Sequence, residues 1–131
     1  MSSWCSISAG VPQGGVLSPL LFAVFINSIS NQLSSFYHFY ADDLQIYTQA
    51  PINMLSDTFN IINADLQRIG EWSYNYGLMI NPMKTQVCVI GSPRLISKVN
   101  WTLLPQIQFG GTTLEISTTV KNLGIYMDNT L

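Results

Sequence analysis

Two stretches of the chain carry apolar residues at helical spacing. In the first, Phe22, Ile26, Ile29 and Leu33 recur at intervals of 4, 3 and 4 residues, after a Ser-Pro pair at positions 18 and 19 that suits a helix start. In the second, the intervals are 4, 3, 4 and 3, and the apolar positions are Leu55, Phe59, Ile62, Leu66 and Ile69. Ser56 or Asp57 is expected to begin this helix and Gly77 to stop it. The pattern predicts helices over residues 18–33 and 55–76.

Other segments show the composition of strands. Residues 36–48 form two runs of aromatic and β-branched residues around a tight acidic turn. Residues 87–90 are predicted to be a short buried strand, residues 106–116 a hairpin that turns at Gly110-Gly111, and residues 120–127 a last strand. Residues 91–105 lack a clear period and are predicted to be a long loop or insertion.

These elements predict an α+β fold. We expect both helices to pack on one face of an antiparallel sheet, built around the hairpin at 36–48 and the strand near 86–90, with Asp42-Asp43 at the hairpin tip. A length of 131 residues suits one domain. The chain is 47% hydrophobic and only 9% charged, which excludes a disordered tail and predicts that part of its apolar surface meets another partner.

Charge and targeting features narrow the functional class. The net charge of −2 does not suit a stand-alone nucleic-acid binder, whose affinity rests on phosphate contacts. The longest apolar run, residues 20–26, is too short to cross a membrane, and no signal peptide follows Met1. Cys5 and Cys88 are expected to be free thiols. We therefore expect an intracellular protein, in the cytoplasm or the nucleus, without a membrane partner.

Asp42 and Asp43 form the one adjacent acidic pair in the sequence. Two neighbouring carboxylates repel each other unless a cation lies between them, and Mg²⁺ prefers such oxygen ligands. The alternative is that both residues simply solvate a turn, where Asp is common.

Three other features have both a functional and a plain interpretation. The Gly-Pro-rich loop at residues 10–15 could let a nucleotide or template approach its backbone, or be an ordinary loop. Lys84 could face a phosphate, or be a solvated chain end. His38 is interpreted as structural, because neither a cysteine nor a second histidine lies at metal-ligand spacing from it.

Taken in order, these motifs resemble those of reverse transcriptases. Residues 10–19, Gly-Val-Pro-Gln-Gly-Gly-Val-Leu-Ser-Pro, followed by an apolar helix, resemble motif B, and Tyr40-Ala41-Asp42-Asp43 resembles the Tyr-x-Asp-Asp signature of motif C. The helix to Tyr76 with residues 78–85 is similar to motif D, and residues 123–128 to the segment after it. The resemblance is to the non-LTR retrotransposon type and covers nearly the whole chain.

The resemblance implies a polymerase palm with a ferredoxin-like arrangement of helices on an antiparallel sheet. It implies that Asp42 and Asp43 hold divalent metal, Mg²⁺ or Mn²⁺, in a two-metal site, and that Tyr40 lies beside the primer end. It also implies that Gln13 and Gly14 line the template and nucleotide, and that Lys84 approaches the triphosphate as a proton donor. The implied partners are an RNA template, a DNA primer, a deoxynucleoside triphosphate and the remainder of the polymerase chain.

The chain also departs from the family pattern. Gly15 stands where the family often has Ser, and no aspartate here matches motif A, which precedes motif B. The fingers and thumb are not found either. We therefore expect residues 1–131 to be a partial reverse transcriptase domain that is inactive alone. The alternative is a non-enzymatic nucleic-acid-binding or interaction domain that keeps the palm fold.

Overall fold

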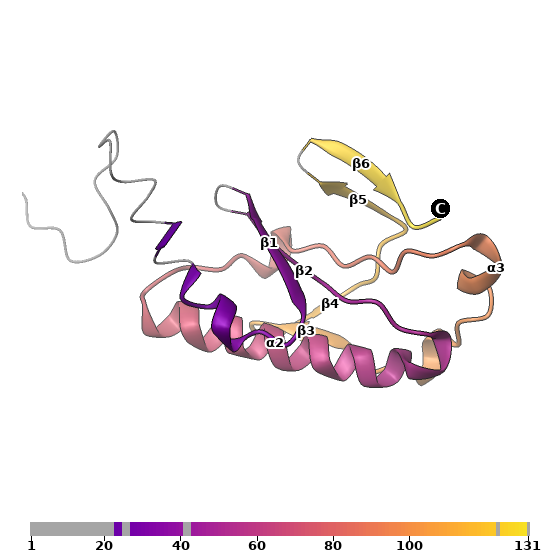
Figure 1. Cartoon of the computed structure of the whole chain (residues 1–131), viewed down its shortest axis with the longest axis horizontal. Coiled ribbons are helices and arrows are strands. Elements are labelled where there is room, and N and C mark those ends of the chain that lie inside the picture. The colour runs from indigo at the N-terminus through magenta and orange to yellow at the C-terminus, as the bar shows by residue number, and fades with distance from the viewer. Residues whose placement is uncertain (1–22, 25–26, 41–42, 123, 131) are drawn as a thin grey trace, which may run out of the picture.

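The structure is a computed structural model that describes residues 23–24, 27–40, 43–122 and 124–130. It confirms the α+β class: one long helix, α2, is accompanied by short antiparallel hairpins (Figure 1). The helices are α2 (Leu55–Asn75) and α3 (Pro93–Ile96), and 3₁₀ turns occupy Ser30–Gln32, Ile52–Met54, Pro82–Lys84 and Trp101–Leu103. The strands are β1 (Phe36–Tyr40), β2 (Asp43–Tyr47), β3 (Ile107–Phe109), β4 (Thr112–Leu114), β5 (Thr119–Asn122) and β6 (Ile125–Asp128).

The strands pair as three separate two-stranded sheets, β1–β2, β3–β4 and β5–β6. The prediction of one sheet that includes a strand at 87–90 is therefore wrong for the described residues. Val87 forms only an isolated parallel bridge with Ile116, and Gly91 forms another with Thr130. The two bridges join the segment to different parts of the chain, and neither extends into a ladder.

Two further predictions need correction near the C-terminus. The single strand expected at 120–127 is the hairpin β5–β6, in which Asn122 pairs with Ile125 and Gly124 adopts a φ of 83°. A glycine tolerates this left-handed backbone, so it allows the reversal inside an otherwise strand-like run. The predicted loop at 91–105 contains helix α3, which Ser92 caps by accepting a hydrogen bond from the Leu95 N–H.

Helix α2 confirms the second predicted helix. It begins at Leu55, directly after a 3₁₀ turn, so the expected start at Ser56 or Asp57 is wrong by one or two residues. Its end is a Schellman motif: the Gly77 N–H donates to the Tyr74 carbonyl, and the Leu78 N–H to the Ser73 carbonyl. Gly77 has a φ of 70°, which confirms its role as the helix stop.

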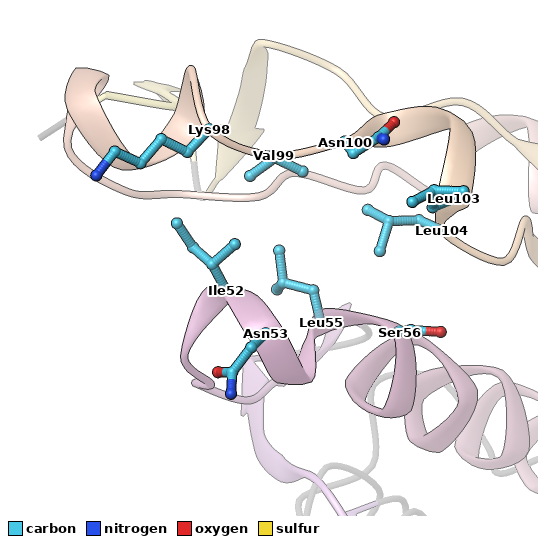
Figure 2. A pocket seen from close by; sticks show the side chains of 9 residues that line it. All are labelled: Ile52, Asn53, Leu55, Ser56, Lys98, Val99, Asn100, Leu103 and Leu104. Atoms are coloured by element: carbon cyan, nitrogen blue, oxygen red, sulfur yellow. The ribbon is translucent and has the colours of Figure 1, made fainter.

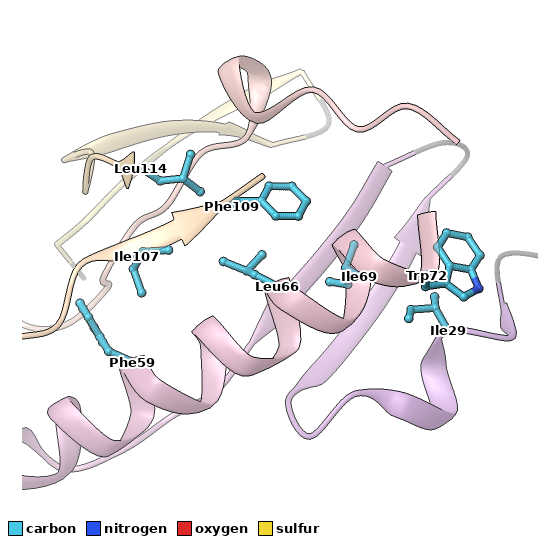
Figure 3. Packing of buried hydrophobic residues seen from close by; sticks show 8 residues of the cluster. All are labelled: Ile29, Phe59, Leu66, Ile69, Trp72, Ile107, Phe109 and Leu114. Carbon is cyan, nitrogen blue, oxygen red and sulfur yellow. The ribbon is translucent and has the colours of Figure 1, made fainter. Parts of the chain in front are cut away.

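The hydrophobic core lies between α2 and the β3–β4 hairpin, as Figure 3 shows. Its members are Ile29, Phe59, Leu66, Ile69, Trp72, Ile107, Phe109 and Leu114. Asn63 reinforces this contact, because its side-chain amide donates to the Gln106 carbonyl at 2.8 Å and accepts from the Gln108 N–H at 3.0 Å. The apolar stripe predicted for residues 55–69 thus faces β3, which lies along the helix.

The first predicted helix is described only in part. Ala23, Val24 and Asn27 are helical, the chain then tightens into the 3₁₀ turn Ser30–Gln32, and Leu33 is extended. The helix therefore ends before residue 33, and its expected start at Ser18 lies outside the described residues. No helix within the described ranges is long and apolar enough to cross a membrane.

Candidate active site on the β1–β2 hairpin

The structure describes three of the six predicted site residues. Tyr40 ends β1, Asp43 begins β2, and Lys84 ends the 3₁₀ turn that follows α2. Gln13, Gly14 and Asp42 lie outside the described residues, as does Cys5; Cys88, half-buried, is a free thiol as expected.

The pairing register places Tyr40 and Asp43 on the same face of the hairpin. They are directly opposite each other at its tip, and side chains that pair directly across antiparallel strands point to one side. The other face carries Phe39, Leu44 and Ile46, which pack against the core. Because the inner face is anchored, Tyr40 and Asp43 are presented outward: Tyr40 is 57% exposed, and Asp43 is also exposed.

Two contacts support the hairpin away from its tip. At its base, the rings of Phe36 and Tyr47 stack with their centroids 5.6 Å apart. In the middle of β2, the Gln45 side-chain amide donates a hydrogen bond to the side-chain oxygen of Asn122 in β5. His38 is exposed in β1, on the same face as Tyr40, so it is not part of the core.

Lys84 lies on a different element and is not bonded to Tyr40 or Asp43 in the described part of the chain. The turn that carries it is capped by Asn81, whose side-chain oxygen accepts from the Met83 N–H at 3.0 Å. Within the part of the chain that the structure describes, Lys84 forms neither a hydrogen bond nor an ion pair with Tyr40 or Asp43. Its side chain is exposed, so the ammonium group is accessible to a ligand.

The sequence analysis missed Asp65, the fully buried carboxylate of α2. Its Oδ1 accepts hydrogen bonds from the Ser34 N–H at 2.9 Å and from Arg68 at 2.7 Å, and its Oδ2 accepts from the Ser35 N–H at 2.8 Å. Burial raises the pKa of Asp65, but the hydrogen bonds from Ser34, Ser35 and Arg68 outweigh it, so the pKa lies below its usual value. Its position in the sequence could have indicated its burial, because Asp65 lies between Ile62 and Leu66 on the apolar side of the helix.

The described residues contain no group of three or more His, Cys, Asp or Glu side chains able to hold a metal ion. What the hairpin tip offers is the exposed carboxylate of Asp43, next in sequence to Asp42. An oxygen ligand on an accessible turn fits a hard divalent ion that keeps water and substrate in its other positions.

A hollow of about 240 Å³ lies elsewhere, between the start of α2 and residues 98–104 (Figure 2). Ile52 and Leu55 point across it toward Val99 and Leu104, and Lys98 is its one charged lining residue. It contains none of Tyr40, Asp43 and Lys84. The hollow is therefore separate from the candidate site.

Comparison with known proteins identifies the family. Residues 2–127 match the family model described as "Reverse transcriptase (RNA-dependent DNA polymerase)". The chain belongs to the reverse transcriptase family. This confirms the resemblance deduced from the motifs, including the likeness to non-LTR retrotransposon enzymes, and membership implies that the complete enzyme uses divalent metal.

Two curated relatives of this reverse transcriptase chain come from mobile elements. A probable RNA-directed DNA polymerase from transposon BS of Drosophila melanogaster is 29% identical over 94% of this chain. An RNA-directed DNA polymerase from the mobile element jockey of Drosophila funebris is 26% identical over 95% of this chain. The chain spans 14% of the length of each, so it corresponds to one segment of such a polymerase. No solved structure matches.

Proposed function

We propose that residues 1–131 are a partial reverse transcriptase domain that contributes the metal-binding hairpin of an RNA-directed DNA polymerase. The observation that carries this proposal is the shared placement of Tyr40 and Asp43, exposed side by side on the outer face of a hairpin whose inner face is held by the core. An exposed carboxylate on a rigid support is what positioning of a divalent ion requires.

In this proposal Asp43, together with Asp42, holds a divalent ion, Mg²⁺ or Mn²⁺. When bound there, the ion would supply Lewis-acid charge next to a primer 3′ hydroxyl and the leaving pyrophosphate. A site that holds two ions would need carboxylates from more than one strand. We therefore assign the further carboxylate, which the family places in motif A, to the remainder of the polymerase chain.

The other predicted residues take supporting roles in the same proposal. Tyr40, exposed beside Asp43, packs against the primer end through its ring. Lys84 Nζ binds the triphosphate and donates a proton to the departing pyrophosphate oxygen. Gln13 and Gly14 line the template and nucleotide. The support for Lys84 is its accessibility and its place within residues 78–85, the part of the motif D resemblance that follows α2.

The palm architecture is also part of the proposal. The long helix α2 and the anchored inner face of β1–β2 are compatible with a ferredoxin-like palm, in which helices cover one face of a sheet. The RNA template, DNA primer and deoxynucleoside triphosphate are the substrates of the complete polymerase, and the predicted intracellular location goes with them.

The test is primer extension by a polymerase in which this segment is continuous with its upstream and downstream parts. With a labelled DNA primer on an RNA template, Mg²⁺ and deoxynucleoside triphosphates, we expect template-directed extension. Omission of the template is the control and should abolish it. Binding of the primer–template without any incorporation would contradict the proposal and favour the non-enzymatic binding domain.

A further inference from the structure

We propose that Asp65 is a positioning residue for the hairpin that carries Tyr40 and Asp43. The inference rests on the proposed function and adds to it a part of α2 that neither the motifs nor the comparisons assign. By this inference, Asp65 fixes the direction in which the segment before β1 turns away from α2 and enters the strand. The hairpin tip is thereby held where its carboxylate can meet a metal ion.

The geometry of the carboxylate is the first support. Asp65 uses both oxygens on two successive backbone N–H groups, those of Ser34 and Ser35, at 2.9 and 2.8 Å. Two adjacent N–H groups held by one rigid carboxylate fix the orientation of the peptide between them. Phe36, the first residue of β1, follows immediately. The last turn before the strand is therefore clamped to the helix.

The surrounding contacts extend this clamp along one face of α2. Arg68 donates both to Asp65 at 2.7 Å and to the Ser34 hydroxyl at 3.1 Å. One turn further along, Trp72 Nε1 donates to the Ser28 hydroxyl at 2.9 Å. Between these two points Ile29 is fully buried in the core (Figure 3). The segment from Ser28 to Ser35 is thus fastened to α2 at both ends.

The consequence at the tip follows from the length of the strand. Five residues of β1 at about 3.4 Å each place the tip about 17 Å from the clamp. A rotation of about 10° at the clamp would then move Asp43 by about 3 Å, about the length of a hydrogen bond and enough to take its carboxylate away from a bound ion. β1 pairs only with β2 in the described sheets, and the remaining restraints are the packing of the inner face and the Gln45–Asn122 hydrogen bond. Loss of the clamp should therefore loosen the tip without releasing the hairpin.

The first measurement uses residues 1–131 and amide hydrogen exchange. In Asp65→Asn, exchange at the Ser34 and Ser35 amides should accelerate at least about tenfold more than exchange at the Ile69 amide in α2, whose own change reports any loss of global stability. Asp57→Asn is the matched control, because it makes the same change at an exposed position of the same helix. Unchanged exchange at both serine amides in Asp65→Asn would overturn the inference.

The second measurement uses the polymerase described above and follows its Mg²⁺ dependence. The extension rate is divided by the burst amplitude, which counts the active molecules. On this scale, Asp65→Asn should raise the Mg²⁺ concentration for half-maximal extension about tenfold. Misfolding would lower the amplitude without moving that concentration. If Asp65→Asn does not fold, Arg68→Gln, which loosens the same carboxylate from its solvent side, should raise it about threefold.

The outcomes separate this inference from the proposed function. If Asp43→Asn abolishes extension while the Asp65 and Arg68 variants keep the wild-type Mg²⁺ dependence, the positioning role is overturned and the function stands. If Asp43→Asn leaves extension unchanged, the proposed function fails, and the exchange measurement alone decides whether Asp65 clamps β1.

Discussion

The polymerase that contains this segment should lose about a thousandfold in extension rate when Asp43 is changed to Asn. A neutral amide keeps the size of the side chain but removes the charge that binds the metal ion, and metal stabilisation of the reacting oxygens amounts to several kcal/mol, or about three powers of ten in rate. The hairpin itself should survive, because Asp43 is exposed and its neighbours Phe39 and Leu44 hold the inner face.

Glu115→Gln provides the control for this experiment. Glu115 is an exposed carboxylate just after β4, so its neutralisation changes the net charge by the same amount outside the candidate site. We expect its extension rate to stay within about twofold of the wild type, as for most surface substitutions. Equal losses in Asp43→Asn and Glu115→Gln would show that charge in general, rather than a metal site at the hairpin, governs the rate.

The largest effect on stability is expected at Asp65. Asp65→Ala leaves the buried Ser35 N–H and the partly buried Ser34 N–H without their acceptor, and Arg68 without its carboxylate partner. A buried donor left without its acceptor costs about 1–3 kcal/mol, a large share of the stability of a domain this size, whereas Arg68, 42% exposed, stays solvated. Urea unfolding of residues 1–131, followed by circular dichroism, measures the change in free energy. Asp57→Asn should change it by less than about 1 kcal/mol.

The same residue should make stability depend on pH. Since the pKa of Asp65 is lower in the folded chain than in the unfolded one, its ionised form stabilises the fold above the unfolded pKa, which is about 4. This stabilisation is lost as the pH falls through the folded pKa. The free-energy gap between the wild type and Asp65→Asn should therefore be constant from pH 7 to 5 and shrink below pH 4. A gap that widens on acidification would contradict the hydrogen-bond network as the cause.

The elements that were predicted correctly are those with helical periodicity or a characteristic turn sequence. The stripe from Leu55 to Ile69 predicted α2 because one buried face repeats every three or four residues, and Gly110-Gly111 marked the β3–β4 turn because both residues take positive φ. The segments at 87–90 and 120–127 were misassigned for a different reason. Short apolar runs do not specify their partners, and Gly124 was the local sign of a turn inside the second run.

The candidate site was only partly accessible from sequence. Asp42 and Asp43 could be proposed from the sequence because adjacent carboxylates repel each other without a cation. Asp65 could not be assigned a role, because its partners Ser34 and Ser35 lie about 30 residues earlier and meet it only through tertiary packing. A charged residue on a buried helical face indicates that it has a hydrogen-bonding partner, but the sequence does not show which residue that partner is.

Mn²⁺ titration of residues 1–131 by NMR tests most directly whether the β1–β2 tip binds the divalent ion. Paramagnetic Mn²⁺ broadens nearby amide signals, and two carboxylates on one turn should bind it weakly, with water in most positions. We expect the Tyr40 and Asp43 amides to broaden first, and this broadening to vanish in the double variant Asp42→Asn, Asp43→Asn. Broadening that starts at Asp57 or Asp128, or that persists at the tip of the double variant, would contradict the account.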